Sequence, residues 1–171
     1  MKIDKKSIKK KLNCEKHRIA IVVSNFNRSV TDKLLKGALS ALKEYGVQKK
    51  NIKVIRVPGA FEIPIITSNL LRPLNTKDEV DGIITLGCLI KGETAHFEYI
   101  SSSVSNTLNQ LSTNGRIPIG FGILTCYTKQ QALDRCKINP ITPDCNKGYE
   151  SVMAVLETIN IIGKPLSDIL F

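Results

Sequence analysis

The sequence contains no tryptophan, only two histidines and no long hydrophobic run. No apolar stretch approaches the roughly 20 residues that a transmembrane helix needs, so we expect no membrane span. The basic N-terminus is not followed by an apolar segment, and it therefore does not have the pattern of a secretory signal peptide. These absences argue against a membrane protein and against a secreted one.

Cysteine is present but lacks the arrangement of a structural framework. The five residues are Cys14, Cys88, Cys126, Cys136 and Cys145. Their number is odd and no C-x-x-C pair occurs, which indicates neither a disulfide scaffold nor a zinc site. We expect free thiols, a cytoplasmic location and no bound metal.

Acidic residues are outnumbered by basic ones, and the net charge is +10. Residues 1–18 carry eight Lys or Arg against Asp4 and Glu15, a net charge of +6. We interpret residues 1–17 as a basic, partly disordered arm and residues 18–171 as one domain. A basic arm can bind nucleic acid, but no aromatic side chain lies among these lysines to stack on bases. A solvated tail is therefore favoured, with a nucleic-acid-associated protein as an alternative.

Short apolar strands alternate with amphipathic helices through the rest of the chain, and 42% hydrophobic residues supply a core. Strands are predicted at residues 18–24, 52–57, 82–86 and 117–124. Helices are predicted from Ser29 or Thr31 to a C-cap at Gly46, over 61–71 with Pro64 in its first turn, from about Phe97 to Asn114, and over 130–136 and 147–162. This alternation predicts an α/β fold, a three-layer α/β/α sandwich with a four-stranded parallel sheet of flavodoxin-like type.

The most informative segment is Gly87-Cys88-Leu89-Ile90-Lys91-Gly92-Glu93-Thr94-Ala95-His96-Phe97. It joins a predicted buried strand to a predicted helix, and it holds one of the two histidines. Ligands of parallel sheets bind at the carboxyl ends of strands, and the N–H groups at a helix start bind anions. We therefore expect this loop to form part of a binding site.

Three further loops follow the other predicted strands and carry Phe26, Glu62 and Arg135. Each residue has an ordinary alternative: Phe26 a core residue, Glu62 a carboxylate in a first helical turn, Arg135 a surface cation. Their shared position at one sheet edge favours a site. An aromatic face, a carboxylate, an imidazole and a cation suit a planar polar heterocycle and a phosphorylated partner, with His96 moving protons.

Six ordered blocks of sequence carry a resemblance to a known family. They are Ser24-Asn25-Phe26-Asn27, Val57 to Pro64, Gly87 to Tyr99, Phe121 to Thr125, Gln131 to Arg135 and Asn146-Lys147-Gly148. Over residues 18–162 the chain resembles the 6,7-dimethyl-8-ribityllumazine synthases of riboflavin biosynthesis. The histidine loop and the block around Pro58-Gly59-Ala60-Phe61-Glu62 are the most specific parts of this match.

The resemblance implies a reaction and an assembly. It implies condensation of 5-amino-6-(D-ribitylamino)uracil with 3,4-dihydroxy-2-butanone 4-phosphate, with no metal or organic cofactor. It also implies two small-molecule substrates, sites between subunits of a homo-oligomer, and riboflavin synthase as a further partner. Family members form pentamers, which in many cases close into a sixty-subunit shell. For this chain we favour the pentamer.

The resemblance also implies roles for thirteen residues. The pyrimidine and its ribityl chain would contact Phe26, Ala60, Phe61, Glu62, Cys88, Leu89, Ile90, Phe121 and Lys147, with Phe121 coming from a neighbouring subunit. The phosphate would be held by Glu93, Thr94 and Arg135. His96 would be the catalytic residue.

Two departures from the family pattern bear on this interpretation. Asn25 stands where the family often has Arg, and residues 137–145 form a longer, proline-containing loop that leaves the placement of Lys147 open. A non-catalytic flavin- or nucleotide-binding module is the alternative function. Such a module would not need His96 and Arg135 together.

Overall fold

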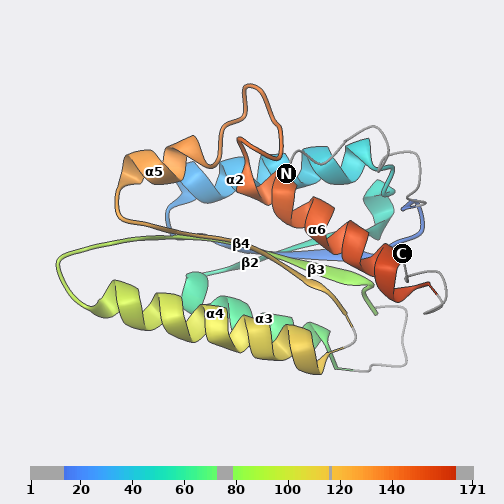
Figure 1. Ribbon diagram of the computed structural model, residues 1–171, viewed down its shortest axis with the longest axis horizontal. Helices are drawn as coiled ribbons and strands as arrows, with labels where there is room; N and C mark the ends of the chain where they lie inside the picture. Colours follow the sequence, from blue (N-terminus) through green and yellow to red (C-terminus); the bar gives the residue numbers. More distant parts are fainter. Residues whose placement is uncertain (1–13, 73–78, 116, 165–171) are drawn as a thin grey trace.

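The computed structural model describes residues 14–72, 79–115 and 117–164 as a parallel sheet between two layers of helices (Figure 1). The strands are β1 (Ile19–Ser24), β2 (Ile52–Val57), β3 (Gly82–Ile90) and β4 (Ile119–Cys126). The helices are α2 (Arg28–Glu44), α3 (Ile63–Leu70), α4 (His96–Asn114), α5 (Lys129–Asp134) and α6 (Lys147–Ile162), with 3-10 turns η1 (Lys49–Asn51) and η2 (Ala60–Glu62). The sheet order is β2-β1-β3-β4, and all pairs are parallel. This confirms the predicted α/β/α sandwich with a four-stranded parallel, flavodoxin-like sheet.

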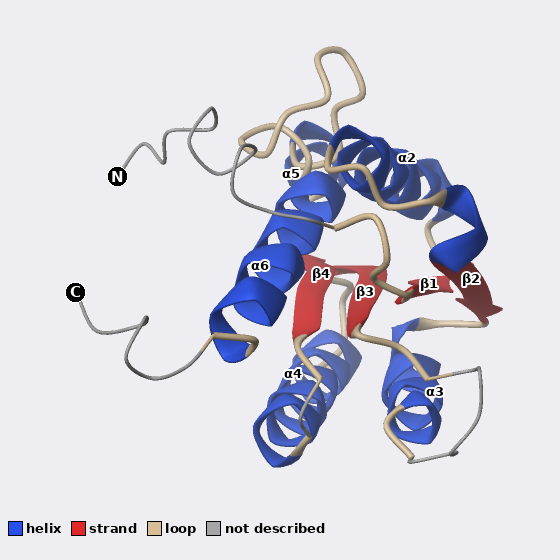
Figure 2. Ribbon diagram, turned by 90° about the vertical axis from the view of Figure 1, so that its right-hand side faces the viewer, coloured by secondary structure: helices blue, strands red, loops and turns tan. Residues whose placement is uncertain are grey.

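The sheet is covered on both faces, as Figure 2 shows: α2, α5 and α6 lie on one side, and α3 and α4 on the other. Every residue of β1 is buried because this strand has a neighbour on each side and helices above and below. Successive residues of β1 pack into the hydrophobic cores on opposite faces of the sheet. Ile21 and Val23 pack with α2 and α6, while Ala20 and Val22 pack with α3 and α4.

Two predicted strand ends are wrong, and both corrections extend the sheet toward its carboxyl edge. β3 continues through Ile90, so residues 87–90 are strand rather than loop. Gly87 does not break the strand because it pairs with Ile123, and a Cβ there would lie only 3.3 Å from the side chains of Ile63 and Ile123 in the core on the α3 and α4 side. β4 begins two residues later than predicted and ends at Cys126, which pairs with Ile90.

The helix boundaries agree with the prediction at α6 and at the end of α4, Asn114, and differ by a few residues elsewhere. Residues 147–162 form the expected helix, Pro64 lies in the first turn of α3, and Gly46 has the left-handed conformation (φ 81°) that ends α2. α2 begins at Arg28, close to the predicted start, but its N-cap is Asn27 and not Ser29 or Thr31. A 3-10 turn replaces the start of the helix predicted from residue 61, and α5 spans 129–134 rather than 130–136.

The N-terminal part of the described chain packs on the domain. Cys14 is buried and belongs to the core on the α2 and α6 side. The Asn51 side chain donates a hydrogen bond to the Glu15 carbonyl oxygen at 3.0 Å. Most of the predicted basic arm, residues 1–13, lies outside the described residues. None of the helices that the structure describes is both long enough and apolar enough to cross a membrane.

Candidate active site

A cleft of about 560 Å³ lies at the carboxyl ends of β1, β2 and β3. Its volume is in the range of small-molecule sites. Nine of the thirteen predicted residues line it: Phe26, Ala60, Phe61, Glu62, Cys88, Leu89, Ile90, Thr94 and His96. Parallel strands of one sheet end at the same edge, and this brings together loops that are far apart in sequence.

Phe26 forms an aromatic wall of the cleft and is 67% exposed, so it is not an ordinary core residue. Its backbone N–H donates to the Pro58 carbonyl oxygen at 3.0 Å. The next residue, Asn27, has a left-handed backbone (φ 56°) and no side-chain capping bond at the start of α2. Its amide instead donates to the Cys88 carbonyl oxygen at 2.9 Å. The Phe26 loop is therefore tied to both neighbouring strand ends.

The end of β3 leaves backbone groups open to this cleft. β3 pairs with β1 only as far as Leu86, whereas its pairing with β4 continues to Ile90. The hydrogen bond from Asn27 shows that the Cys88 carbonyl points toward the β1 side. Because the N–H and C=O of alternate strand residues point to the same side, those of Ile90 face the cleft as well. The Cys88 carbonyl is already engaged by Asn27, whereas the Ile90 N–H and C=O can bind the polar edge of a planar ligand.

The Cys88 side chain does not share this accessibility. It is 1% exposed, and burial together with the nearby thiols Cys126 and Cys136 raises the pKa of Cys88 to about 12. A thiol with that pKa stays protonated at neutral pH and is a poor nucleophile. Cys88 therefore contributes to the cleft through its backbone.

Glu62 stabilises the turn that follows β2. One of its carboxylate oxygens accepts a hydrogen bond from the Gly59 N–H at 2.8 Å, across the 3-10 turn Ala60–Glu62. A carboxylate has lone pairs for several further bonds, so Glu62 can also accept from hydroxyl groups of a ligand. The turn leads directly into α3 and holds Phe61, which is 60% exposed, at the rim.

His96 is the first residue of α4 and is exposed at the cleft. The residue before it, Ala95, cannot cap the helix with its side chain, so N–H groups of the first turn remain available. These groups and the helix dipole favour an anion beside Thr94 and His96. Glu93 is exposed in the same loop but does not line the cleft.

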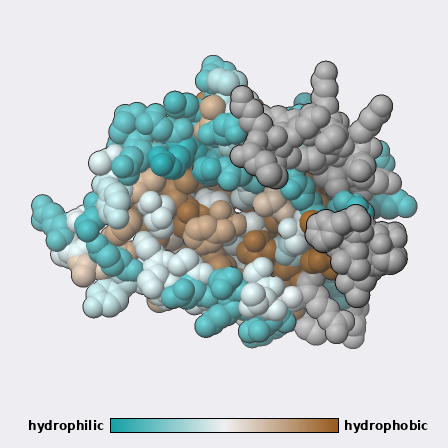
Figure 3. Space-filling model, in the orientation of Figure 1, coloured by the Kyte–Doolittle hydropathy of each residue, from teal (hydrophilic) through white to brown (hydrophobic). Residues whose placement is uncertain are grey.

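Phe121, Arg135 and Lys147 are not in this cleft. They line a second, smaller cleft of about 190 Å³ along β4. β4 is an edge strand, and Phe121 is 48% exposed on it. Figure 3 shows an apolar band between the two helical layers on the face that carries β4. One chain thus presents the predicted site as two separate halves.

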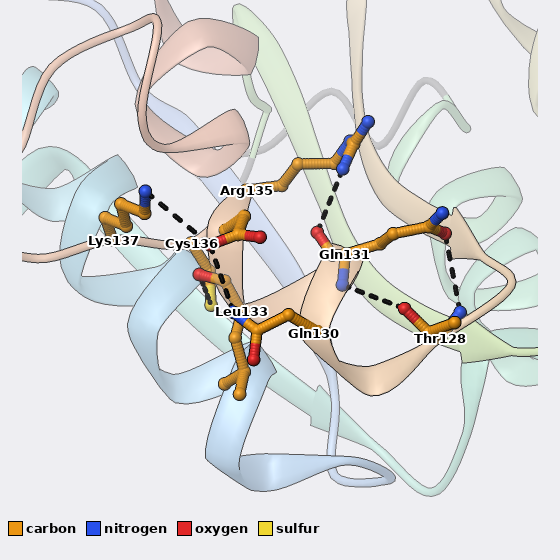
Figure 4. A network of polar contacts seen from close by, with 8 residues as sticks. Thr128, Gln130, Gln131, Leu133, Arg135, Cys136 and Lys137 are labelled. Carbon is orange, nitrogen blue, oxygen red and sulfur yellow. Dashed lines mark hydrogen bonds and ion pairs between the residues drawn. The ribbon is translucent and has the colours of Figure 1, made fainter.

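Arg135 and Lys147 are held side by side although a long loop separates them in sequence. Cys136 and Asn146 form an antiparallel bridge, and the Lys147 N–H donates to the Arg135 carbonyl oxygen at 2.9 Å. The Arg135 guanidinium donates to the Gln131 carbonyl oxygen at 3.0 Å (Figure 4). Lys147 forms an exposed ion pair with Glu150. Lys147 therefore lies beside Arg135 at the second cleft, apart from the main cleft that holds Phe26 and Glu62.

Sequence reasoning gave no role to four residues that line the main cleft. They are Gly59, Gly92, Phe97 and Ile100. Phe97 and Ile100 could have been found from the apolar spacing of α4, which starts at the cleft. Within residues 14–72, 79–115 and 117–164, no three His, Cys, Asp or Glu side chains gather in a way that could hold a metal ion.

Comparison with known families identifies the family of the chain. The sequence model of 6,7-dimethyl-8-ribityllumazine synthase matches residues 16–162 of the 171-residue chain. The match includes all four strands, all five helices and both clefts. The chain therefore belongs to the 6,7-dimethyl-8-ribityllumazine synthase family, the transferases that make lumazine in riboflavin biosynthesis.

Proposed function

We propose that this protein condenses 5-amino-6-(D-ribitylamino)uracil with 3,4-dihydroxy-2-butanone 4-phosphate to give 6,7-dimethyl-8-ribityllumazine, phosphate and water. The observation that carries this proposal is the main cleft, in which an exposed aromatic ring faces open strand backbone and an exposed histidine begins a helix. A planar pyrimidine, a polyol and a phosphate each find matching chemistry there.

The ribitylaminouracil would lie against the Phe26 ring, with its edge toward the backbone of Cys88 and Ile90. Its ribityl hydroxyls would reach the backbone of Ala60 and Phe61 and the free lone pairs of Glu62. Stacking of a nucleobase on an aromatic side chain is worth about 1–3 kcal/mol, which is sufficient to orient the ring. The apolar groups of Leu89 would cover part of this surface.

The butanone phosphate would bind beside the N-terminus of α4, at Glu93 and Thr94. Attack of the substrate amine on the ketone forms an imine and releases one water. Loss of the phosphate then removes one proton from the carbon chain, and ring closure onto the second amine releases another water. His96 lies where it can accept and return these protons, which is the usual contribution of a histidine near neutral pH.

The site would be completed by a second copy of the chain. The half with Phe121, Arg135 and Lys147 lies on the free edge of the sheet, apart from the half with Phe26 and His96. Placing this edge over the main cleft of a neighbour would cover the heterocycle with Phe121. It would also bring the Arg135 guanidinium to the phosphate, where a planar fork binds well.

The direct test is incubation of the full-length protein with both substrates. The expected result is lumazine absorbance together with free phosphate in a one-to-one ratio, with neither signal when one substrate is omitted. A non-catalytic flavin-binding module would bind a flavin or the pyrimidine without releasing phosphate. Absence of phosphate release with both substrates bound would exclude the synthase reaction.

Mixed oligomers test the shared site. The oligomers are reassembled from equal amounts of dissociated His96→Ala and Arg135→Ala subunits. About one quarter of the shared sites then combine an unchanged His96 from one subunit with an unchanged Arg135 from its neighbour. Turnover of the mixture should then exceed that of both parents. Turnover that equals the mean of the two parents would show that each site lies within one chain.

A further inference from the structure

The loop that carries Thr94 and His96 is closed at its base by an ion pair. Lys91 directly follows β3, and its backbone N–H continues the sheet by donating to the Cys126 carbonyl oxygen at 2.9 Å. Glu98 lies in the first turn of α4. The Lys91 Nζ is 2.6 Å from the Glu98 Oε1, so the pair joins the end of the strand to the start of the helix.

Tyr127 supports this pair from the β4–α5 connection. The Lys91 Nζ lies 5.7 Å from the centroid of the Tyr127 ring, which is within the range of a cation–π contact. The same ring packs against Phe97 with centroids 6.3 Å apart. The Tyr127 N–H donates to the side-chain oxygen of Gln131 at 2.8 Å. The backbone N–H of Gln131 in turn donates to the Thr128 hydroxyl (Figure 4).

The loop between these anchors has few other attachments. Glu93, Thr94 and His96 are exposed, and their side chains form no hydrogen bond or ion pair within the described part of the chain. The fully buried side chains of α4 begin only at Val104, two turns after His96. The position of the first turn of α4 therefore depends on the half-buried Phe97 and Ile100 and on the contacts at the base of the loop.

The charges of the pair support each other. The hydrogen bond between them raises the pKa of Lys91 and lowers the pKa of Glu98, so both remain ionised over a wide range of pH. Both side chains are nearly half exposed, and exposed ion pairs contribute little to folding stability. The Lys91–Glu98 pair therefore contributes more to the local geometry of the loop than to the folding stability of the protein.

We propose that Lys91 and Glu98 are positioning residues, which with Tyr127 clamp the loop and hold His96 and Thr94 at the geometry required for the reaction. This inference rests on the proposed lumazine synthase activity. Small errors in the placement of a reacting group can lower a rate about 100-fold, so loss of the clamp should reduce kcat more than it weakens binding of the pyrimidine substrate.

Single and paired variants test the clamp. Glu98→Gln and Lys91→Met should each lower kcat about tenfold or more, with less than about a twofold change in the KM for the ribitylaminouracil. Lys91→Glu combined with Glu98→Lys should restore most of the lost kcat, because the pair is rebuilt with its charges exchanged. The matched control is Glu79→Gln, since Glu79 is equally exposed and pairs with Arg18 instead of Lys91. This variant should retain full activity.

Two results would overturn the proposal. Full kcat in both single variants would show that the clamp has no role. If the exchanged pair stays as slow as Lys91→Met while Lys91→Arg is active, Lys91 binds the phosphate itself. Thermal unfolding of every variant, compared with the parent, separates loss of activity from loss of fold.

Hydrogen exchange keeps the test independent of the proposed reaction. Without substrates, amides of residues 92–98 should exchange about tenfold faster in Glu98→Gln than in the parent, while those of Glu79→Gln remain unchanged. If the parent makes no lumazine but shows this difference, the proposed function fails and the clamp stands. If exchange is unchanged in Glu98→Gln, the clamp fails even in an active enzyme.

Discussion

His96 is a single exposed imidazole at the start of α4, and the reaction needs several proton transfers. General acid–base help from one residue typically contributes about 10²–10⁴-fold, while holding two reactants together contributes separately. We therefore expect His96→Ala to lower turnover within this range and to leave binding of the ribitylaminouracil intact. Steady-state kinetics and calorimetry measure the two effects. A variant with full turnover would remove His96 from the mechanism.

Phe26 and Arg135 should affect different substrates, since one is an aromatic surface and the other a cation at a separate cleft. Arg135→Ala should weaken the butanone phosphate far more than the ribitylaminouracil, because only the former carries a phosphate. Phe26→Ala should weaken the pyrimidine by about 1–3 kcal/mol and spare the phosphate substrate. Equal weakening of both substrates by Arg135→Ala would indicate a structural role for this residue.

Cys88 tests whether a cleft residue acts through its backbone or through its side chain. Burial raises the pKa of its thiol, so we expect no labelling of Cys88 by iodoacetamide in the native protein at pH 7. Cys88→Ala should retain near-parental kcat and lose about 1 kcal/mol of unfolding free energy, as for a small core truncation. Mass spectrometry and chemical denaturation measure these outcomes. Rapid labelling of Cys88 together with loss of turnover would instead indicate a reactive thiol.

At the scale of elements, Asn146 connects three parts of the structure. It is fully buried, and its oxygen accepts hydrogen bonds from the N–H groups of Gly148 and Tyr149 at the start of α6. Its amide nitrogen donates to the carbonyl oxygens of Lys33 in α2 and Lys137 in the loop. The sequence block Asn-Lys-Gly gave only a weak signal for this role.

Asn146→Ala should destabilise the protein by about 2–4 kcal/mol, because it removes the side-chain cap of α6 and both hydrogen bonds from the buried amide to the carbonyl oxygens of Lys33 and Lys137. Asn146→Asp keeps the cap but places a buried carboxylate oxygen against both carbonyl oxygens, so it should be at least as destabilising as Asn146→Ala. Chemical denaturation of the three proteins gives the order. An Asn146→Ala variant as stable as the parent would show that water replaces these contacts without loss.

The sequence predicts some boundaries of these elements and misses others for physical reasons. The range of α6 could be predicted because Asn146 caps its start and its apolar residues keep helical spacing. The extension of β3 could not, because Gly87 and Cys88 are followed by loop residues and strand pairing with β4 decides the end. The main cleft could be predicted because three of the four loops, those after β1, β2 and β3, meet at one edge of the sheet. Its separation from Arg135 depends on β4 being an edge strand, which alternation alone does not reveal.

At the scale of the whole molecule, the proposed shared site implies a homo-oligomer, and the loop at 137–145 bears on the number of its subunits. Figures 1 and 2 show this loop rising from the layer of α2, α5 and α6, away from the sheet. Its base is closed by the Cys136–Asn146 bridge and by the Lys137 N–H, which donates to the Cys145 carbonyl oxygen at 3.0 Å. A projecting loop would obstruct close contact between rings, and a net charge of +10 per subunit adds repulsion at low salt.

We therefore propose a pentamer, five times 18.9 kDa or about 95 kDa, rather than a shell of about 1.1 MDa. Size-exclusion chromatography with light scattering measures the mass. Replacement of residues 138–144 by Asn-Gly should preserve the closed base of the loop, because a two-residue turn of this type joins antiparallel strands. This shortened variant should form larger particles at high protein concentration and high salt if the loop blocks assembly. A parent particle near a million daltons that persists on dilution would refute the pentamer, and a fully active monomer would refute the shared site as well.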